Sequence, residues 1–209
     1  MQDALRAKQR LENDFGHLWL IAGVDVAYDV VRNLAWASIV TMQPGVLRPA
    51  EQVMAYAPAD FPYIPGLLSF REIPAILEAM KKLTFLPSLL MVDGQGIAHP
   101  RRMGIAAHLG VLLNLPSIGV AKSRLTGNHE EPGPNKGDYA PLIAGSQRIG
   151  TVLRSKENTH PLYVSPGHRV DMETATALTL QCLTRYRLPE PTRFADKLSK
   201  TRGEGMLLL

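Results

Sequence analysis

Three strand-like segments follow one another near the start of the chain with only turn-sized separators between them. They cover residues 18–28, 34–42 and 51–57. The separators, at 31–33 and 43–45, are too short for a helix and contain Asn, Pro and Gly. Strands joined by such short turns pair antiparallel with their neighbours. The sequence therefore predicts a three-stranded antiparallel meander as the first part of the fold.

The pattern changes after a loop at 62–66. Helical spacing of apolar residues runs over 69–83 and 102–115, and each helix is followed by a short apolar strand, at 88–93 and 117–122. Such alternation adds parallel strands to one sheet. Three antiparallel strands followed by parallel αβαβ is the element order of the ribonuclease H-like fold. We therefore expect an α/β protein with a mixed sheet flanked by helices.

The remaining segments fit a single domain over 1–209. The 209 residues are 45% hydrophobic and 20% charged, which are ordinary globular values. No repeat or linker divides them. We expect an N-terminal helix over 1–14, a Gly- and Pro-rich surface loop over 126–138, two or three short strands around 140–165, and a helix from about 171 to 185.

Composition excludes several classes of protein. Cys182 is the one cysteine, so an internal disulfide or a cysteine-based zinc site is excluded, and we expect a buried, inert thiol in a reducing cytoplasm. No apolar run is long enough to span a membrane and no signal sequence opens the chain, so no membrane association is expected. The net charge of +4 is compatible with a polyanionic partner, although many proteins of this charge bind none.

Two acids stand on apolar strands. Asp25 lies in the middle of "LIAGVDVAYD", and Asp93 ends the strand of "LLMVDGQGIAHPRR". A buried carboxylate costs several kcal/mol unless it is paired or binds a metal. In the expected topology the two acids lie on neighbouring strands, where Mg²⁺ between them would relieve their repulsion. The alternatives are a hydrogen-bonded structural Asp25 and a simple turn at Asp93.

Three more residues are candidates for chemistry, each with an ordinary alternative. Glu72 could join the acids, or it could complete a capping box with Ser69 at a helix start. His168 precedes a helix and could be a general base, a metal ligand or an exposed loop residue. Lys122 ends the strand "SIGVAK", where a charge also commonly marks a strand end.

A basic group follows the second acid directly. His99, Arg101 and Arg102 lie within ten residues of Asp93. Their charges suit phosphate binding, and a solvated surface is the alternative.

Six strings of the sequence resemble the endonuclease V family of DNA repair, the deoxyinosine 3′ endonucleases. They are "AGVDVAY", "PYIPGLLSFRE", "VDGQGIAHPRRMG", "IGVAKSRL", "SPGHRV" and "YRLPEPTR", in order from about residue 20 to 194. The resemblance implies Mg²⁺-dependent hydrolysis of a phosphodiester on the 3′ side of deoxyinosine, with Mn²⁺ able to substitute. The cut falls one nucleotide beyond the damaged base and leaves a 3′-hydroxyl and a 5′-phosphate.

The same resemblance implies roles for individual residues. Asp25, Glu72 and Asp93 would be the acidic metal site, and His168 a further catalytic residue. Lys122 and His99 would support catalysis or contact phosphate, and Arg101 and Arg102 keep the phosphate-binding role that their charge suggests. Gln95 departs from the family, because many members have His there; an amide keeps hydrogen-bonding capacity but carries no proton at neutral pH.

Two elements of substrate recognition are also implied. The "PYIPG" loop, with Tyr63, Ile64 and Pro65, would be a wedge that separates strands, and a rigid connector is the alternative. The flipped base would lie against the loop after Asp93. The residues implied for this base pocket are Leu68, Gly94, Gly96, Ile105 and Leu125.

Two rival functions remain. The same chemistry could act on inosine-containing RNA, since nothing in the sequence recognises or excludes a 2′-hydroxyl. A non-catalytic binder of deaminated nucleic acid is the other rival, and the intact acids argue against it. We expect a monomer.

Overall fold

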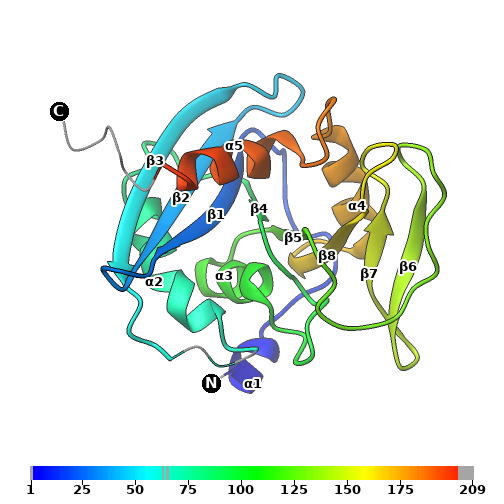
Figure 1. Ribbon diagram of the computed structural model, residues 1–209, viewed down its shortest axis with the longest axis horizontal. Helices are drawn as coiled ribbons and strands as arrows, with labels where there is room; N and C mark the ends of the chain where they lie inside the picture. The colour runs from blue at the N-terminus through cyan, green and yellow to red at the C-terminus, as the bar shows by residue number, and fades with distance from the viewer. Residues whose placement is uncertain (1, 63, 65, 202–209) are drawn as a thin grey trace.

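One mixed sheet runs through the part of the chain that the computed structural model describes, residues 2–62, 64 and 66–201 (Figure 1). The sheet has eight strands in the order β3-β2-β1-β4-β5-β8-β7-β6. The strands are β1 (Ile21–Asp29), β2 (Leu34–Met42), β3 (Pro49–Pro58), β4 (Leu89–Val92), β5 (Ser117–Ala121), β6 (Tyr139–Ala144), β7 (Gln147–Leu153) and β8 (Leu162–His168). The helices are α1 (Gln2–Arg6), α2 (Ser69–Met80), α3 (Ile105–Leu113), α4 (Met172–Gln181) and α5 (Glu190–Ser199).

The expected meander is confirmed. β1 pairs antiparallel with β2 in continuous register from Ile21↔Met42 to Asp29↔Leu34, and β2 pairs antiparallel with β3 with a register shift between Thr41 and Met42. Asn33 and Gly45 adopt positive φ in the two connections, which the turns require and which these residue types tolerate. The helix–strand alternation then adds β4 parallel to β1 and β5 parallel to β4. The arrangement is the ribonuclease H-like one that the element order predicts.

The last three strands complete the sheet on the other side of β5. β8 pairs antiparallel with β5, and β7 and β6 continue antiparallel to the edge. These are the short strands expected around 140–165.

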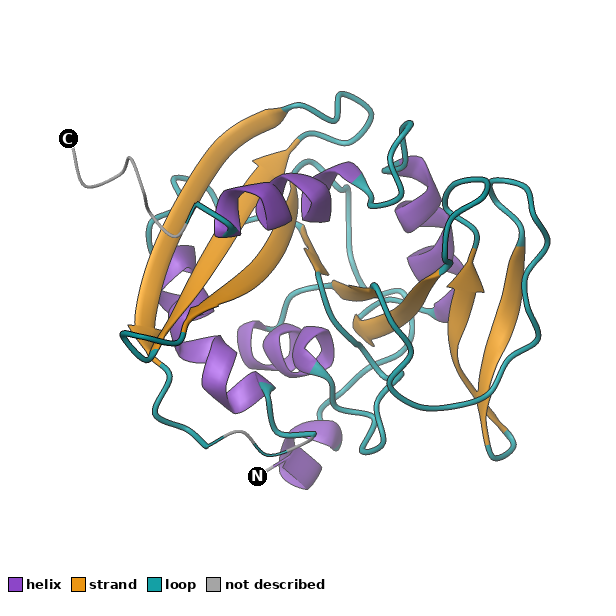
Figure 2. Ribbon diagram, viewed as in Figure 1, coloured by secondary structure: helices purple, strands orange, loops and turns teal. Residues whose placement is uncertain are grey.

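Helices cover both faces of the sheet (Figure 2). Side chains alternate along a strand, so Ala22 and Val24 of β1 enter the apolar core beneath α2 and α3. The opposite face of the meander lies under α5, which crosses β1 and β2 (Figure 1). Asp25 therefore points towards α5, because it alternates with Val24.

Two elements differ from expectation. The N-terminal helix ends at Arg6, because the following residues extend along the end of β8: Gln9 donates to the Gly167 carbonyl and Arg169 donates to the Arg10 carbonyl. Helix α5 was not predicted. Its sequence signal is Pro191 in the first turn, a position that proline favours.

Within the described ranges, the helices are all too short or too polar to traverse a bilayer.

Candidate metal centre and neighbouring pocket

Strand β1 holds Asp25 beneath helix α5. Gly23, two residues earlier on the same face, allows this close approach, since a Cβ there would lie 1.9 Å from the Pro191 carbonyl oxygen. At the other end of the helix the Ser199 hydroxyl donates to Asp25 Oδ2 at 2.5 Å. The helix is therefore docked on the strand on both sides of Asp25.

Strand β4 brings Asp93 beside Asp25, as the topology predicts. Val92 pairs with Val24, and the Asp93 amide donates to the Val24 carbonyl at 2.9 Å. The two acids thus occupy adjacent positions just beyond the last parallel pair of β1 and β4.

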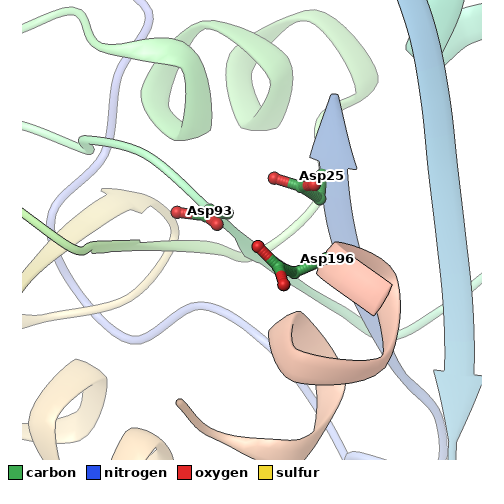
Figure 3. A group of neighbouring side chains, drawn as sticks. All are labelled: Asp25, Asp93 and Asp196. Carbon is green, nitrogen blue, oxygen red and sulfur yellow. The ribbon is translucent and has the colours of Figure 1, made fainter. Parts of the chain in front are cut away.

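A third carboxylate, Asp196 of α5, completes the cluster (Figure 3). Asp25, Asp93 and Asp196 each offer one oxygen, and these oxygens all lie within 4.8 Å of one another. Asp196 was missed at the sequence level, where it is one acid in the polar segment "RFADKLSK". No local pattern marks it, because its place in the cluster depends on where α5 docks on the sheet.

The Lys122 ammonium lies among these acids. Its Nζ is 2.5 Å from Asp93 Oδ2 and 2.5 Å from Asp196 Oδ1. Burial alone would lower the pKa of Lys122, but the neighbouring carboxylates, Asp93 above all, raise it. Lys122 is therefore charged, and it belongs to the cluster rather than merely ending a strand.

Crowding raises the cost of ionising Asp25. Burial, and then the charge of Asp93, raise the pKa of Asp25 to about 7, against the hydrogen bond from Ser199 and the charge of Lys122. Three converging carboxylates form a hard, all-oxygen donor set of the kind that divalent cations such as Mg²⁺, Ca²⁺ and Mn²⁺ prefer. The cluster fits a divalent metal ion, and Asp25, Asp93 and Asp196 are the residues that would hold it.

Glu72 lies beside the cluster on the first turn of α2. The capping-box interpretation is wrong, because Leu68 is the N-cap of α2. The Ser69 hydroxyl bonds to His108 Nδ1 at 3.0 Å instead of capping the helix. Glu72 Oε1 accepts a hydrogen bond from the Tyr28 hydroxyl at 3.1 Å. Burial, and then the charges of Asp25 and Asp93, raise the pKa of Glu72 to about 8, against the hydrogen bond from Tyr28 and the charge of Arg71.

A pocket of about 230 Å³ adjoins the cluster, since Asp93 and Glu72 both line it. Four of the five residues implied for the base pocket line it: Leu68, Gly94, Ile105 and Leu125. Other lining residues are Ile64, Gly66, Ser69, Gln95, His99, Met103 and Gly104. A larger apolar groove of about 740 Å³ lies between β3 and α2 and includes none of the clustered carboxylates.

Gly96 does not line this pocket, and that expectation is corrected. A Cβ on Gly96 would lie 2.2 Å from the Pro166 carbonyl oxygen, so the residue faces the backbone of β8. Glycine is needed there for close packing of the loop on the sheet. Gly94 does face the pocket wall: its φ is +154°, and a Cβ would lie 2.6 Å from Ile105 Cγ2.

Gln95 and the basic group occupy the same loop. The Gln95 amide donates to the Ser123 carbonyl at 3.0 Å, and its buried Oε1 has no hydrogen-bond partner among the described residues. His99 is buried against the pocket, and burial, together with Arg101 and Arg102, lowers its pKa. Arg102 turns away to bond Gln147 at 3.0 Å and the His99 carbonyl at 2.8 Å, so it stabilises the loop.

Comparison with known proteins identifies the family. A model of the Endonuclease V family matches residues 3–197. The Endonuclease V of Rippkaea orientalis is 52% identical over 203 residues, which cover 97% of this chain and 89% of that protein. That of Azotobacter vinelandii is 50% identical over 203 residues, covering 97% and 92%. This chain belongs to the Endonuclease V family.

Solved Endonuclease V structures share the whole fold. The Streptomyces avermitilis enzyme has a TM-score of 0.92 at 43% identity, covering 99% of this chain and 91% of that one. The human catalytic domain has a TM-score of 0.89 at 33% identity, covering 100% and 95%. The Ciona intestinalis enzyme, at 27% identity and a TM-score of 0.84 over 98% and 95%, was solved with a 24mer DNA containing an inosine followed by a ribo-adenosine.

His168, for which the resemblance to the Endonuclease V family implies a catalytic role, lies away from the clustered acids. His168 pairs with Ser117 at the start of β5, whereas Lys122 follows the end of that strand, roughly 16 Å away at the usual rise per residue. Its ring accepts from the Arg10 amide at 3.2 Å and meets Asn114 Oδ1 at 3.3 Å. Burial and the charges of Arg10 and Arg169 lower the pKa of His168 to about 4. In this structure it is a neutral, buried anchor for the N-terminal segment, and a direct catalytic role for it is not supported.

The wedge implied for Endonuclease V lies only partly in the described chain. Tyr63 and Pro65 are outside the described residues. Ile64 is 40% exposed and lines the mouth of the pocket with Leu68.

Proposed function

We propose that this chain hydrolyses a phosphodiester on the 3′ side of deoxyinosine in DNA, in a Mg²⁺-dependent reaction that leaves a 3′-hydroxyl and a 5′-phosphate. The observation that carries the proposal is that Asp93 belongs both to the carboxylate cluster and to the wall of the pocket. A base held in the pocket would keep its own backbone beside the carboxylates. Family membership and the inosine-containing DNA of the Ciona intestinalis complexes support this substrate.

The acids would hold the metal, and the other polar residues would bind the phosphate. Mg²⁺ bound by Asp25, Asp93 and Asp196 would supply Lewis-acid chemistry, which polarises a phosphodiester and makes a bound water more acidic; Mn²⁺ prefers the same ligands. Glu72, which lines the pocket with Asp93 but is not one of the three clustered carboxylates, would orient that water through a hydrogen bond. Lys122 and His99 would donate to phosphate oxygens.

The pocket suits a flipped, deaminated purine. Leu68, Ile105 and Leu125 offer apolar surface to the faces of a base. Hypoxanthine lacks the 2-amino group of guanine and carries O6 where adenine carries an amino group. Selection would then come from donors directed at O6 and from lack of space at C2, with the lower cost of extruding a mispaired base adding to it. Tyr63, Ile64 and Pro65 remain our candidates for opening the duplex.

A cleavage assay tests the proposal. Matched DNA duplexes carrying deoxyinosine or deoxyadenosine at one position are incubated with Mg²⁺ or with chelator, and the product ends are mapped. We expect cleavage of the inosine strand only, on its 3′ side and only with metal. Equal cleavage of both duplexes, or cleavage in chelator, would refute the proposal.

RNA is a second candidate substrate, favoured by one observation. The nucleic acid in the Ciona intestinalis complexes carries a ribo-adenosine after the inosine. The same assay with inosine-containing RNA of matched sequence separates the two. Faster cleavage of the RNA would make this chain a ribonuclease, and binding without cleavage of either would make it a non-catalytic binder.

A further inference from the structure

Lys122 is the cation already bonded to the proposed metal ligands. Its Nζ lies 2.5 Å from one oxygen each of Asp93 and Asp196, and the side chains of these acids are only 10% and 16% exposed. The ammonium therefore compensates the charge of Asp93 and shares the compensation of Asp196 with Lys200. The Lys122 side chain itself is 39% exposed and has room to move.

The ammonium and a divalent ion need the same small space. Mg²⁺ binds oxygen at about 2.0–2.1 Å, so an ion that binds more than one of these carboxylates must lie between their oxygens, which lie within 4.8 Å of one another. The Lys122 ammonium, 2.5 Å from one oxygen each of Asp93 and Asp196, would then lie a few ångströms from a doubly charged ion. Like charges at that separation repel strongly, so both cations cannot keep their best contacts.

Only the side chain of Lys122 is free to respond. Arg187 donates to the Lys122 carbonyl at 2.8 Å, and the preceding residue is still paired in β5. The flexible four-carbon stem can carry the ammonium away from the acids while the backbone stays in place.

We propose that Lys122 is an exchangeable counter-ion: a divalent cation displaces it from Asp93 and Asp196, and the displaced ammonium then binds the substrate phosphate. The second half of this inference rests on the proposed function; the first half does not. Lys122 thereby couples the two events, because metal binding makes the ammonium available to the nucleic acid. By reciprocity, bound nucleic acid strengthens metal binding.

Metal binding to the protein alone tests the displacement. Mg²⁺ and Mn²⁺ affinities are measured by calorimetry for the wild type, Lys122→Met and Lys122→Gln. Both neutral variants should bind the ions at least roughly tenfold more tightly, since a competing positive charge is gone. If Lys122 instead serves to position Asp93, both variants will bind metal more weakly, and the inference is overturned. Thermal melting identifies a variant that has failed to fold, and the other variant then decides.

Lys200 offers a matched control. It bonds the other oxygen of the same acid, with Nζ 2.6 Å from Asp196 Oδ2, but its side chain is 71% exposed and it does not contact Asp93. Lys200→Met removes one positive charge from the same carboxylate. We expect a change in metal affinity of less than about threefold, as for other exposed pairs. A gain equal to that of Lys122→Met would mean that net charge, not displacement, sets the affinity.

Nucleic-acid binding tests the coupling. Affinity for an inosine-containing duplex is measured in chelator and in Ca²⁺, with gels to verify that the strand stays intact. Ca²⁺ should strengthen binding less for Lys122→Met than for the wild type or Lys200→Met, although the variant binds metal more tightly. An equal or larger gain for Lys122→Met overturns the coupling. If the wild type shows no preference for inosine-containing DNA, while the neutral Lys122 variants still bind metal more tightly than the wild type, the proposed function is refuted and the displacement stands.

Discussion

Glu72 should make the metal-free protein less stable as the pH rises. The residue is buried beside two acids, and its pKa is raised from the ordinary value of 4.5 to about 8, first by burial and then by Asp25 and Asp93. A raised carboxyl pKa means that the folded state binds a proton that the unfolded state has released. Stability is therefore lost between pH 4.5 and about 8, in the window between the two pKa values.

The magnitude follows from those two values. Linkage at 1.36 kcal/mol per pKa unit gives a cost of about 1 kcal/mol at pH 5 and about 4 kcal/mol at pH 8. Glu72→Gln keeps the acceptor for the Tyr28 hydroxyl and cannot ionise. Between pH 5 and pH 8 the free energy of unfolding should therefore fall by about 3 kcal/mol more in the wild type than in Glu72→Gln.

Urea unfolding in chelator at pH 5, 6, 7 and 8 measures this difference. Asp25 contributes to the pH dependence of both proteins, so the comparison isolates Glu72. Excess Mg²⁺ should reduce the pH dependence of the wild type, since a nearby cation favours ionised carboxylates. Parallel pH dependences for the two proteins in chelator would refute the reasoning, because Glu72 would then ionise at its ordinary pKa.

Three further predictions concern the metal centre, the loop and the pocket. Asp196→Asn should abolish cleavage as completely as Asp93→Asn and weaken Mg²⁺ binding at least tenfold by calorimetry, without lowering the melting temperature; near wild-type cleavage would exclude Asp196 as a ligand. Gly96→Ala should cost about 3 kcal/mol in urea unfolding, because its Cβ would overlap the backbone of β8, whereas Gly16→Ala, where no atom lies within 4 Å, should change stability by less than about 1 kcal/mol; equal effects would contradict this packing. Leu125→Ala, at a residue 52% exposed, should reduce the preference for inosine over adenine in a competition assay and leave melting unchanged; an unaltered preference would remove Leu125 from the pocket.

The sheet and two of its acids could be predicted because they depend on local pattern. Turn-sized separators force neighbouring strands to pair antiparallel, and intervening helices force parallel pairing, so the positions of β1 and β4 follow from segment lengths. Asp25 and Asp93 were then adjacent by topology alone. Glu72 needed the family resemblance, since Ser69 and Glu72 also have the spacing of a capping box, and local spacing cannot reveal that the Ser69 hydroxyl bonds a distant His108 instead.

Residues placed by long-range packing could not be predicted in this way. Asp196 reaches the cluster because α5 lies across β1, and no pattern within 190–199 specifies that docking. His168 lies at the far end of β8 because β8 is antiparallel to β5, whereas motif order along the chain carries no strand direction. The resemblance assigned both Gly94 and Gly96 to the pocket, but a Cβ on Gly94 would meet Ile105 of the pocket wall, whereas a Cβ on Gly96 would meet the backbone of β8.

The docking of α5 also explains how the fold holds acids that repel one another. Gly23 allows Pro191 of the helix to approach β1 closely, and the Ser199 hydroxyl donates to one carboxylate oxygen of Asp25. Apolar burial of α5 against β2, through Ala195 with Val40 and Met42, supplies free energy that does not depend on the charges. The carboxylates are therefore brought together by packing of α5 on the face of β1 and β2 that carries Asp25, where Val40 pairs with Gly23. A bound cation therefore has to neutralise the carboxylate charges but does not have to bring the carboxylates together. A divalent ion can enter this arrangement with little rearrangement beyond the Lys122 side chain.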